Sequence, residues 1–191
     1  GRDLWTLSRE GSAEELALTE NTQPLMLAAG IAAWRVWRDR GGAEPAWLAG
    51  HSLGEYTALV AAGALAFPDA VRLVAERARF MQEAVAEDAG AMAAVLGLDD
   101  EAVRAACAGA AGSGVVEAVN YNAPGQVVIA GDKAAVERAV EAAKEHGARR
   151  AMLLPVSVPS HCRLMQPAAE RLRGALADVP IGRPGIAVVN N

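Results

Sequence analysis

The pentapeptide GHSLG at residues 50–54 constrains this chain more than any other stretch. The apolar segment AWLA at 46–49 leads into it, and EYTALV at 55–60 follows it with the composition of a helix. We therefore predict a strand, a sharp turn and a helix. A G-x-S-x-G turn in this setting is typical of a nucleophile elbow, in which both glycines let the strand and the helix approach closely and the serine projects from a strained backbone.

This elbow makes Ser52 the candidate nucleophile. The N-terminal amides of the following helix, at the positive end of its dipole, would face an oxyanion formed when the serine reacts. A glycine-flanked turn that holds a serine by chance is the alternative. The strand before the turn and the helix after it favour the elbow.

The composition is that of a globular protein with one domain, or with a domain that carries a small insertion. The chain has 191 residues, of which 52% are hydrophobic and 21% charged, and it can bury a substantial core. The net charge of −5 argues against a nucleic-acid surface. We expect no membrane association, because no apolar run is long enough to span a bilayer and the N-terminus lacks a signal-peptide core. Cys107 and Cys162 lack C-x-x-C spacing, so we expect no metal site, no disulfide and a cytoplasmic location.

Two predicted helices carry polar residues of interest. One opens at Thr22, with this residue as its N-cap and Pro24 in its first turn. The other spans 68–85 and has its charges on one half, except for Arg77, which falls on the apolar half. An unpaired guanidinium would be costly to desolvate there. Either Arg77 snorkels or pairs with a structural carboxylate, or it is a buried cation for an anionic ligand.

The middle of the chain alternates strands and helices in the order βαββαβ, which is the ferredoxin-like arrangement. The predicted strands are 91–98, 115–121, 126–131 and 149–157, and the predicted helices are 99–111 and 133–146. We interpret this region as a small subdomain inserted into a larger α/β unit.

The chain has three histidines, and His161 is the candidate general base for Ser52. It follows Pro159, which keeps the approach extended, in a predicted strand-to-helix loop, and it could face a cleft between subdomain and core. His146 is explained as a cation at a helix C-terminus. His51 is explained as a packed residue beside the elbow.

Four segments together resemble a known family. They are GHSLGEY at 50–56, ERARFMQ with Arg77 at 76–82, NYNAPGQ at 120–126 and VSVPSH at 156–161. In this order they are similar to bacterial malonyl-CoA:acyl carrier protein transacylases of type II fatty-acid synthesis, and the likeness runs over the whole chain.

The resemblance implies the α/β fold class with two parts. The first is an α/β-hydrolase-like core, a parallel sheet with flanking helices, which we expect at 1–88 and 158–191 and incomplete at both ends. The second is the ferredoxin-like subdomain, which we expect at 89–157.

The resemblance also implies an activity. The malonyl group of malonyl-CoA would pass to the phosphopantetheine thiol of holo acyl carrier protein by a ping-pong mechanism, through an ester on Ser52, for fatty-acid elongation. His161 would be the base, Arg77 would clamp the malonyl carboxylate bidentately, and the backbone amide of Leu53 would be an oxyanion donor. Asn122 matches a family position near the acyl pocket, although an Asn before Ala-Pro also suits a turn. Gln23 is open in the same way. We expect no cofactor and a monomer.

The family also contains parts that this chain lacks. Its first strand and a Gly-Gln-Gly-Ser-Gln loop, which supplies a second oxyanion amide, would precede Gly1. A glutamine whose carbonyl orients the histidine would follow Asn191. We therefore expect a Ser–His dyad whose orienting group lies outside this chain, and weak transfer by the isolated chain.

Three alternative functions stay open. A polyketide synthase-type acyltransferase is closely related, but those that accept methylmalonyl groups often carry Tyr-Ala-Ser-His where this chain has VPSH at 158–161. A serine hydrolase or thioesterase would share the elbow but would not need Arg77, and the chain lacks an HGGG-type motif. A non-catalytic carrier-binding scaffold is the third. Arg149 and Arg150 are either carrier contacts or a solvated strand edge.

Overall fold

The computed structural model describes residues 3–156 and 158–191, so Gly1 and the predicted strand end at Ser157 lie outside the described part. The chain divides into two compact units, which we treat separately. Unit 1 consists of Gly1–Arg79 and Leu172–Asn191, and unit 2 consists of Phe80–Arg171. The structure contains parallel and antiparallel strands together with helices, which confirms the α/β class.

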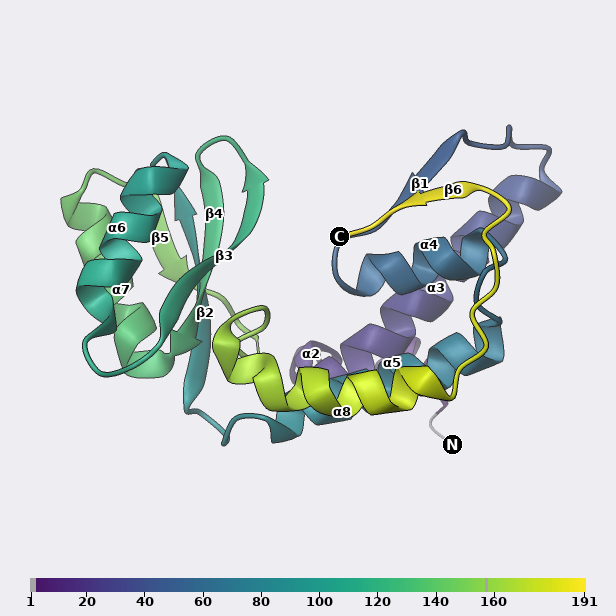
Figure 1. The fold of residues 1–191 in the computed structure, drawn as a ribbon, viewed down its shortest axis with the longest axis horizontal. Helices are drawn as coiled ribbons and strands as arrows, with labels where there is room; N and C mark the ends of the chain where they lie inside the picture. The colour runs from purple at the N-terminus through teal and green to yellow at the C-terminus, as the bar shows by residue number, and fades with distance from the viewer. Residues whose placement is uncertain (1–2, 157) are drawn as a thin grey trace. The chain divides into compact units, whose positions relative to one another are not determined.

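Unit 1 holds the elbow between a pair of strands and several helices. Its elements are α1 (Leu4–Glu10), α2 (Ala13–Ala17), α3 (Thr19–Asp39), β1 (Trp47–Ala49), α4 (Leu53–Ala61), most of α5 (Phe67–Glu83), the end of α8 (Gln166–Ala177) and β6 (Ala187–Val189). Strands β1 and β6 pair in parallel and lie side by side in Figure 1. The core beneath α4 is formed by Leu27, Ile31, Leu65, Ala70 and Val74.

The start of α3 differs from the prediction. The helix begins at Thr19, so Thr22 is not its N-cap. Instead, the hydroxyl of Thr22 lies 2.5 Å from the carbonyl oxygen of Leu16 and 3.1 Å from that of Leu18. The prediction was wrong because these upstream carbonyls offer the threonine partners within the fold, which local propensity does not reveal. As a result Gln23 lies inside the helix, one turn after Thr19.

Unit 2 is a four-stranded antiparallel sheet with two helices on one face (Figure 1). Its elements run β2 (Gly90–Leu96), α6 (Asp100–Ala111), β3 (Val116–Ala123), β4 (Gln126–Asp132), α7 (Lys133–Glu145), β5 (Arg150–Leu153), the 3-10 turn η1 (Arg163–Met165) and the first part of α8. The strand order is β3-β4-β2-β5. The predicted alternation of strands and helices is confirmed here.

Side chains of the sheet alternate between two apolar layers, as the pleat requires. Val95, Val127 and Ile129 pack under α6 and α7, whereas Met92 and Val128 face the opposite side together with Cys162. The last strand is shorter than predicted. It ends at Leu153, and Pro155 soon removes a ladder donor.

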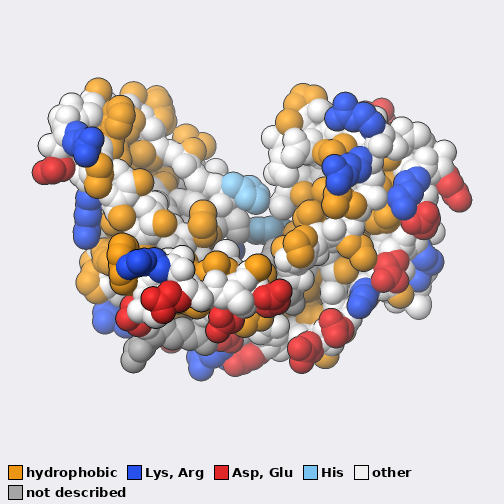
Figure 2. All heavy atoms as spheres, turned by 180° about the vertical axis from the view of Figure 1, so that it is seen from behind, with side chains coloured by type: hydrophobic (Ala, Val, Ile, Leu, Met, Phe, Trp, Pro, Cys, Tyr) orange, Lys and Arg blue, Asp and Glu red, His pale blue; other side chains and the backbone are white. Residues whose placement is uncertain are grey.

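Charged side chains on the face drawn in Figure 2 are dispersed, with lysines and arginines scattered among aspartates and glutamates. Within residues 3–156 and 158–191, no helix has the length and apolarity that a membrane crossing requires. In the same residues, no group of three or more His, Cys, Asp or Glu side chains is arranged to hold a metal ion.

Candidate active site

The predicted strand, turn and helix around Ser52 are confirmed. Strand β1 ends at Ala49 and α4 begins at Leu53, so only three residues make the turn. Ser52 has φ 54° and ψ −113°, a conformation that residues with a side chain rarely adopt and that often marks functional sites. A Cβ added to Gly50 would lie 2.0 Å from the carbonyl carbon of Gly54, so only glycine fits there.

The second glycine of the motif has a different role from the one predicted. A Cβ added to Gly54 would meet nothing within 4 Å. The expectation that both glycines are needed for close approach is therefore wrong for Gly54. The close approach requires glycine at position 50, where an added Cβ would overlap backbone atoms of Gly54 and Glu55.

Asn191 forms a hydrogen bond to the backbone of the elbow, a contact that the sequence did not indicate. Its Oδ1 accepts a hydrogen bond from the backbone N–H of Ser52 at 2.8 Å, and its own N–H donates to Glu55 Oε2 at 3.3 Å. This position follows β6, whose parallel register places Val189 opposite Ala49. The neighbour of the elbow is thus set by strand pairing between segments far apart in the sequence, a contact that no local pattern contains.

Arg77 lies beside the nucleophile. Its Nη2 donates to Ser52 Oγ at 2.9 Å, and its Nη1 donates to Gln23 Oε1 at 2.5 Å. The centroid of the Tyr56 ring lies 5.6 Å from the guanidinium carbon, within cation–π range. Burial lowers the pKa of Arg77 and raises that of Tyr56, yet a guanidinium stays protonated in proteins.

The surroundings of Arg77 distinguish between its two interpretations. Arg77 is half-buried, and no carboxylate in residues 3–156 and 158–191 forms an ion pair with it. A structural carboxylate partner is therefore not found in the described part of the chain. The arrangement favours a cation that is held by neutral groups and can receive an anion.

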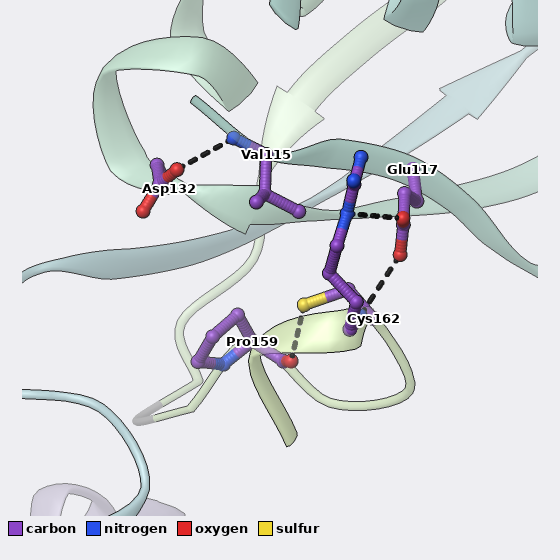
Figure 3. Close-up of polar contacts among 6 residues, drawn as sticks. Val115, Glu117, Asp132, Pro159 and Cys162 are labelled. Atoms are coloured by element: carbon purple, nitrogen blue, oxygen red, sulfur yellow. Dashed lines mark hydrogen bonds and ion pairs between the residues drawn. The ribbon is translucent and has the colours of Figure 1, made fainter. Parts of the chain in front are cut away.

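His161 lies in unit 2, in the loop before η1, and has φ 70°. Its neighbours fix this loop, as Figure 3 shows. Cys162 Sγ donates to the carbonyl oxygen of Pro159 at 3.2 Å, and Glu117 Oε2 on β3 accepts from the backbone N–H of Arg163 at 2.9 Å. The Arg163 side chain also pairs with Glu117 at 2.8 Å. His161, at positive φ, thus lies between Pro159 and Cys162, which are joined by a hydrogen bond, and Arg163 beyond them is held by Glu117.

Asn122 and Leu53 complete the predicted set. Leu53 is the first residue of α4, so its backbone N–H is one of the amides without an acceptor inside the helix. Asn122 lies near the end of β3 in unit 2 and is exposed. The turn-forming alternative for Asn122 is wrong, because the turn consists of Pro124 and Gly125.

The structure therefore brings together Ser52, Arg77, Gln23 and the Leu53 amide within unit 1. His161 and Asn122 belong to unit 2.

Comparison with known proteins gives consistent results. The acyl transferase domain family matches residues 5–190. Malonyl CoA-acyl carrier protein transacylase of Escherichia coli K12 is 59% identical over 191 residues, which cover all of this chain and 62% of that protein. An acyl-carrier-protein S-malonyltransferase structure from Burkholderia pseudomallei is 60% identical with a TM-score of 0.96, covering 100% of this chain and 62% of that one.

A further structure shows a type II PKS acyl-carrier protein in complex with its malonyl-transacylase. It is 54% identical, has a TM-score of 0.97, and covers 100% of this chain and 62% of the matched chain. The present chain thus spans about 62% of the length of these relatives. Because the family match covers nearly every residue, and because the fold and the elbow agree with it, this chain belongs to the acyl transferase domain family.

Proposed function

We propose that this chain carries the acyl-transfer site of a malonyl-CoA:acyl carrier protein transacylase. The observation that carries the proposal is the charged guanidinium of Arg77, which lies 2.9 Å from the nucleophile Ser52 and has no carboxylate partner among the described residues. The names of the relatives support the same activity.

The geometry at Ser52 suits an acyl group with a terminal carboxylate. In a malonyl ester, two carbon–carbon bonds of about 1.5 Å each separate the ester carbonyl carbon from the carboxylate carbon. A cation within hydrogen-bond distance of Oγ can therefore reach the carboxylate of an acyl group bound to the same Oγ. A guanidinium also has five N–H donors in a planar fork that matches a carboxylate. An acetyl group has no carboxylate and would leave this cation without a counter-charge.

In the proposed first half-reaction, Ser52 Oγ attacks the thioester carbonyl of malonyl-CoA while His161 takes the hydroxyl proton. The Leu53 amide, at the positive end of the α4 dipole, stabilises the oxyanion. The carbon–sulfur bond then breaks, and the coenzyme A thiolate leaves with the proton from His161. The product is a malonyl ester on Ser52.

In the second half-reaction, His161 takes the proton of the phosphopantetheine thiol of holo acyl carrier protein. The thiolate attacks the ester carbonyl, and Ser52 Oγ leaves with that proton. All groups in this ping-pong sequence are ordinary side chains and backbone amides, so we propose no cofactor. Asn122 would lie near the acyl pocket.

We propose that unit 1 is an α/β-hydrolase-like core and that unit 2 is a ferredoxin-like subdomain inserted into it, which the strand order β3-β4-β2-β5 supports. Both cysteines are free thiols, which supports a reducing, cytoplasmic setting. We further propose a monomer that serves fatty-acid elongation.

The test uses the full-length protein, malonyl-CoA and intact mass measurement. We expect the mass to increase by one malonyl group, with the added group mapped to Ser52, and to return to its starting value after addition of holo acyl carrier protein. Carriers from fatty-acid and polyketide synthesis distinguish the two transferase settings. Hydrolysis of the ester at the rate of transfer would instead indicate a thioesterase, and a protein that never acquires the ester would contradict the proposal.

A further inference from the structure

Gln23 is the second partner of the Arg77 guanidinium. Its side chain lies on α3 and is only 5% exposed. Its Nε2 donates to Thr19 Oγ1 at 2.9 Å, one helical turn earlier, while its Oε1 accepts from Arg77 Nη1. Because a guanidinium offers only donors, the amide oxygen must face it. Thr19 and Arg77 together therefore fix the orientation of this amide.

The partners of Arg77 in the described part of the chain share one property, which is that none of them carries a negative charge. They are the amide oxygen of Gln23, the hydroxyl of Ser52 and the ring face of Tyr56. Arginines away from water are ordinarily paired with a carboxylate. Here the guanidinium is held in place by hydrogen bonds, yet its charge is not neutralised.

The identity of residue 23 decides this charge balance. Glutamate has the same shape as glutamine and could place a carboxylate oxygen at the same distance from Nη1. A carboxylate there would form an internal ion pair with Arg77, and a substrate carboxylate would then have to compete with it. The amide provides the same hydrogen bond without that competition.

We propose that Gln23 is a positioning residue that determines specificity, because its neutral amide holds Arg77 beside Ser52 while leaving the positive charge available to a carboxylate-bearing acyl group. The inference deepens the proposed function and rests on it. Gln23 acts through Arg77 and does not itself bind the acyl carboxylate.

The test is the Gln23→Glu variant of the full-length protein. We measure kcat/KM for acylation of Ser52 by malonyl-CoA and by acetyl-CoA, together with the melting temperature. The malonyl value should fall by about 30-fold or more, as expected for loss of a desolvated charge pair, mainly through a higher KM. The acetyl value should change by no more than about threefold. The melting temperature should stay the same or rise, because the introduced carboxylate pairs with a cation that lacked a counter-charge.

Two controls isolate the charge at this position. Ala29→Glu adds the same charge to an exposed position of the same helix and should leave the malonyl-to-acetyl ratio unchanged. In an Arg77→Ala background, Gln23→Glu should not change the ratio further, because its effect passes through the guanidinium.

The outcomes separate this inference from the proposed function. An unchanged ratio in Gln23→Glu, with the malonyl ester still formed on Ser52, overturns the inference and leaves the proposed function standing. A collapsed melting temperature also overturns it, because Arg77 then cannot accept a carboxylate at this place. A wild-type protein that forms no malonyl ester on Ser52 overturns both.

Discussion

Replacing Gly50 by alanine should disrupt the elbow, and the structure allows the size of the effect to be worked out. The new Cβ would lie 2.0 Å from the Gly54 carbonyl carbon, 2.1 Å from its oxygen and 2.5 Å from the Glu55 nitrogen. Ordinary contact begins at 3.4 Å. All three atoms belong to the backbone at the start of α4, so the helix itself must move away from β1.

The energetic cost follows from that displacement. Overpacking that flexible side chains can relieve costs about 1–3 kcal/mol. Because backbone atoms must move here, we expect a loss of at least about 3 kcal/mol. For a chain of this size, that loss corresponds to a melting temperature lower by roughly 6–12 °C. A shift of about 1 Å between Ser52 and Arg77 should also lower the acylation rate about 100-fold.

The assay is a thermal melt combined with malonylation of Ser52, and Gly54→Ala is the matched control. Gly54 belongs to the same motif, lies in the first turn of α4 and has open space around the new methyl group. Alanine is the better helix former by about 1 kcal/mol, so this variant should melt at or above the wild-type temperature. If Gly50→Ala melts and reacts like the wild type, our account of the elbow is wrong.

Three further predictions test the site and the core. Ser52→Ala should abolish the malonyl ester seen by intact mass, and peptide mapping of the ester to another residue would contradict the assignment. Arg77→Ala should remove about 2–5 kcal/mol of stabilisation from malonyl transfer and lower the malonyl-to-acetyl ratio of kcat/KM with little change in melting temperature. A structural ion pair would instead cost the fold about 3–5 kcal/mol. Burial raises the pKa of Cys107 from 9.0 to about 11. As the pH rises, this thiol therefore ionises in the unfolded chain before it ionises in the folded protein, and the free energy of unfolding should fall between pH 9 and 11. The urea midpoint of Cys107→Ala should fall less over that range, and equal losses would refute the reasoning.

The parts of the fold that the sequence predicted well are those with a local physical signature. The elbow was predicted because glycine, serine and the change from strand to helix occur within a few residues of Ser52. The order of elements in unit 2 was predicted because segments with the character of strands and of helices alternate along the sequence. In the structure the Asp99 side chain accepts from the Ala102 N–H and caps the first of these helices. Arg77 was noticed because one charge interrupted an apolar helix face.

The parts that the sequence missed depend on distant or competing contacts. Asn191 could not be identified, because its contact with Ser52 depends on the pairing of β1 with β6. Thr22 was misassigned as a cap because its hydroxyl has carbonyl partners in the preceding turn. Gly54 was assigned a packing role on its motif position alone. The pairing of Ser52 with His161 stays a prediction, because the two residues belong to different units.

The contact between Ser52 and Asn191 also has a consequence for biosynthesis. The two residues are 139 positions apart, so a ribosome needs on the order of ten seconds to pass from one to the other. The antiparallel strands of unit 2 are encoded between them and depend on contacts much closer in sequence, which form earlier. We therefore expect the nascent chain to fold this sheet while β1 still lacks its partner strand β6. The hydrogen bond that the Ser52 amide donates to Asn191 can therefore form only after the whole segment between these two residues has been synthesised.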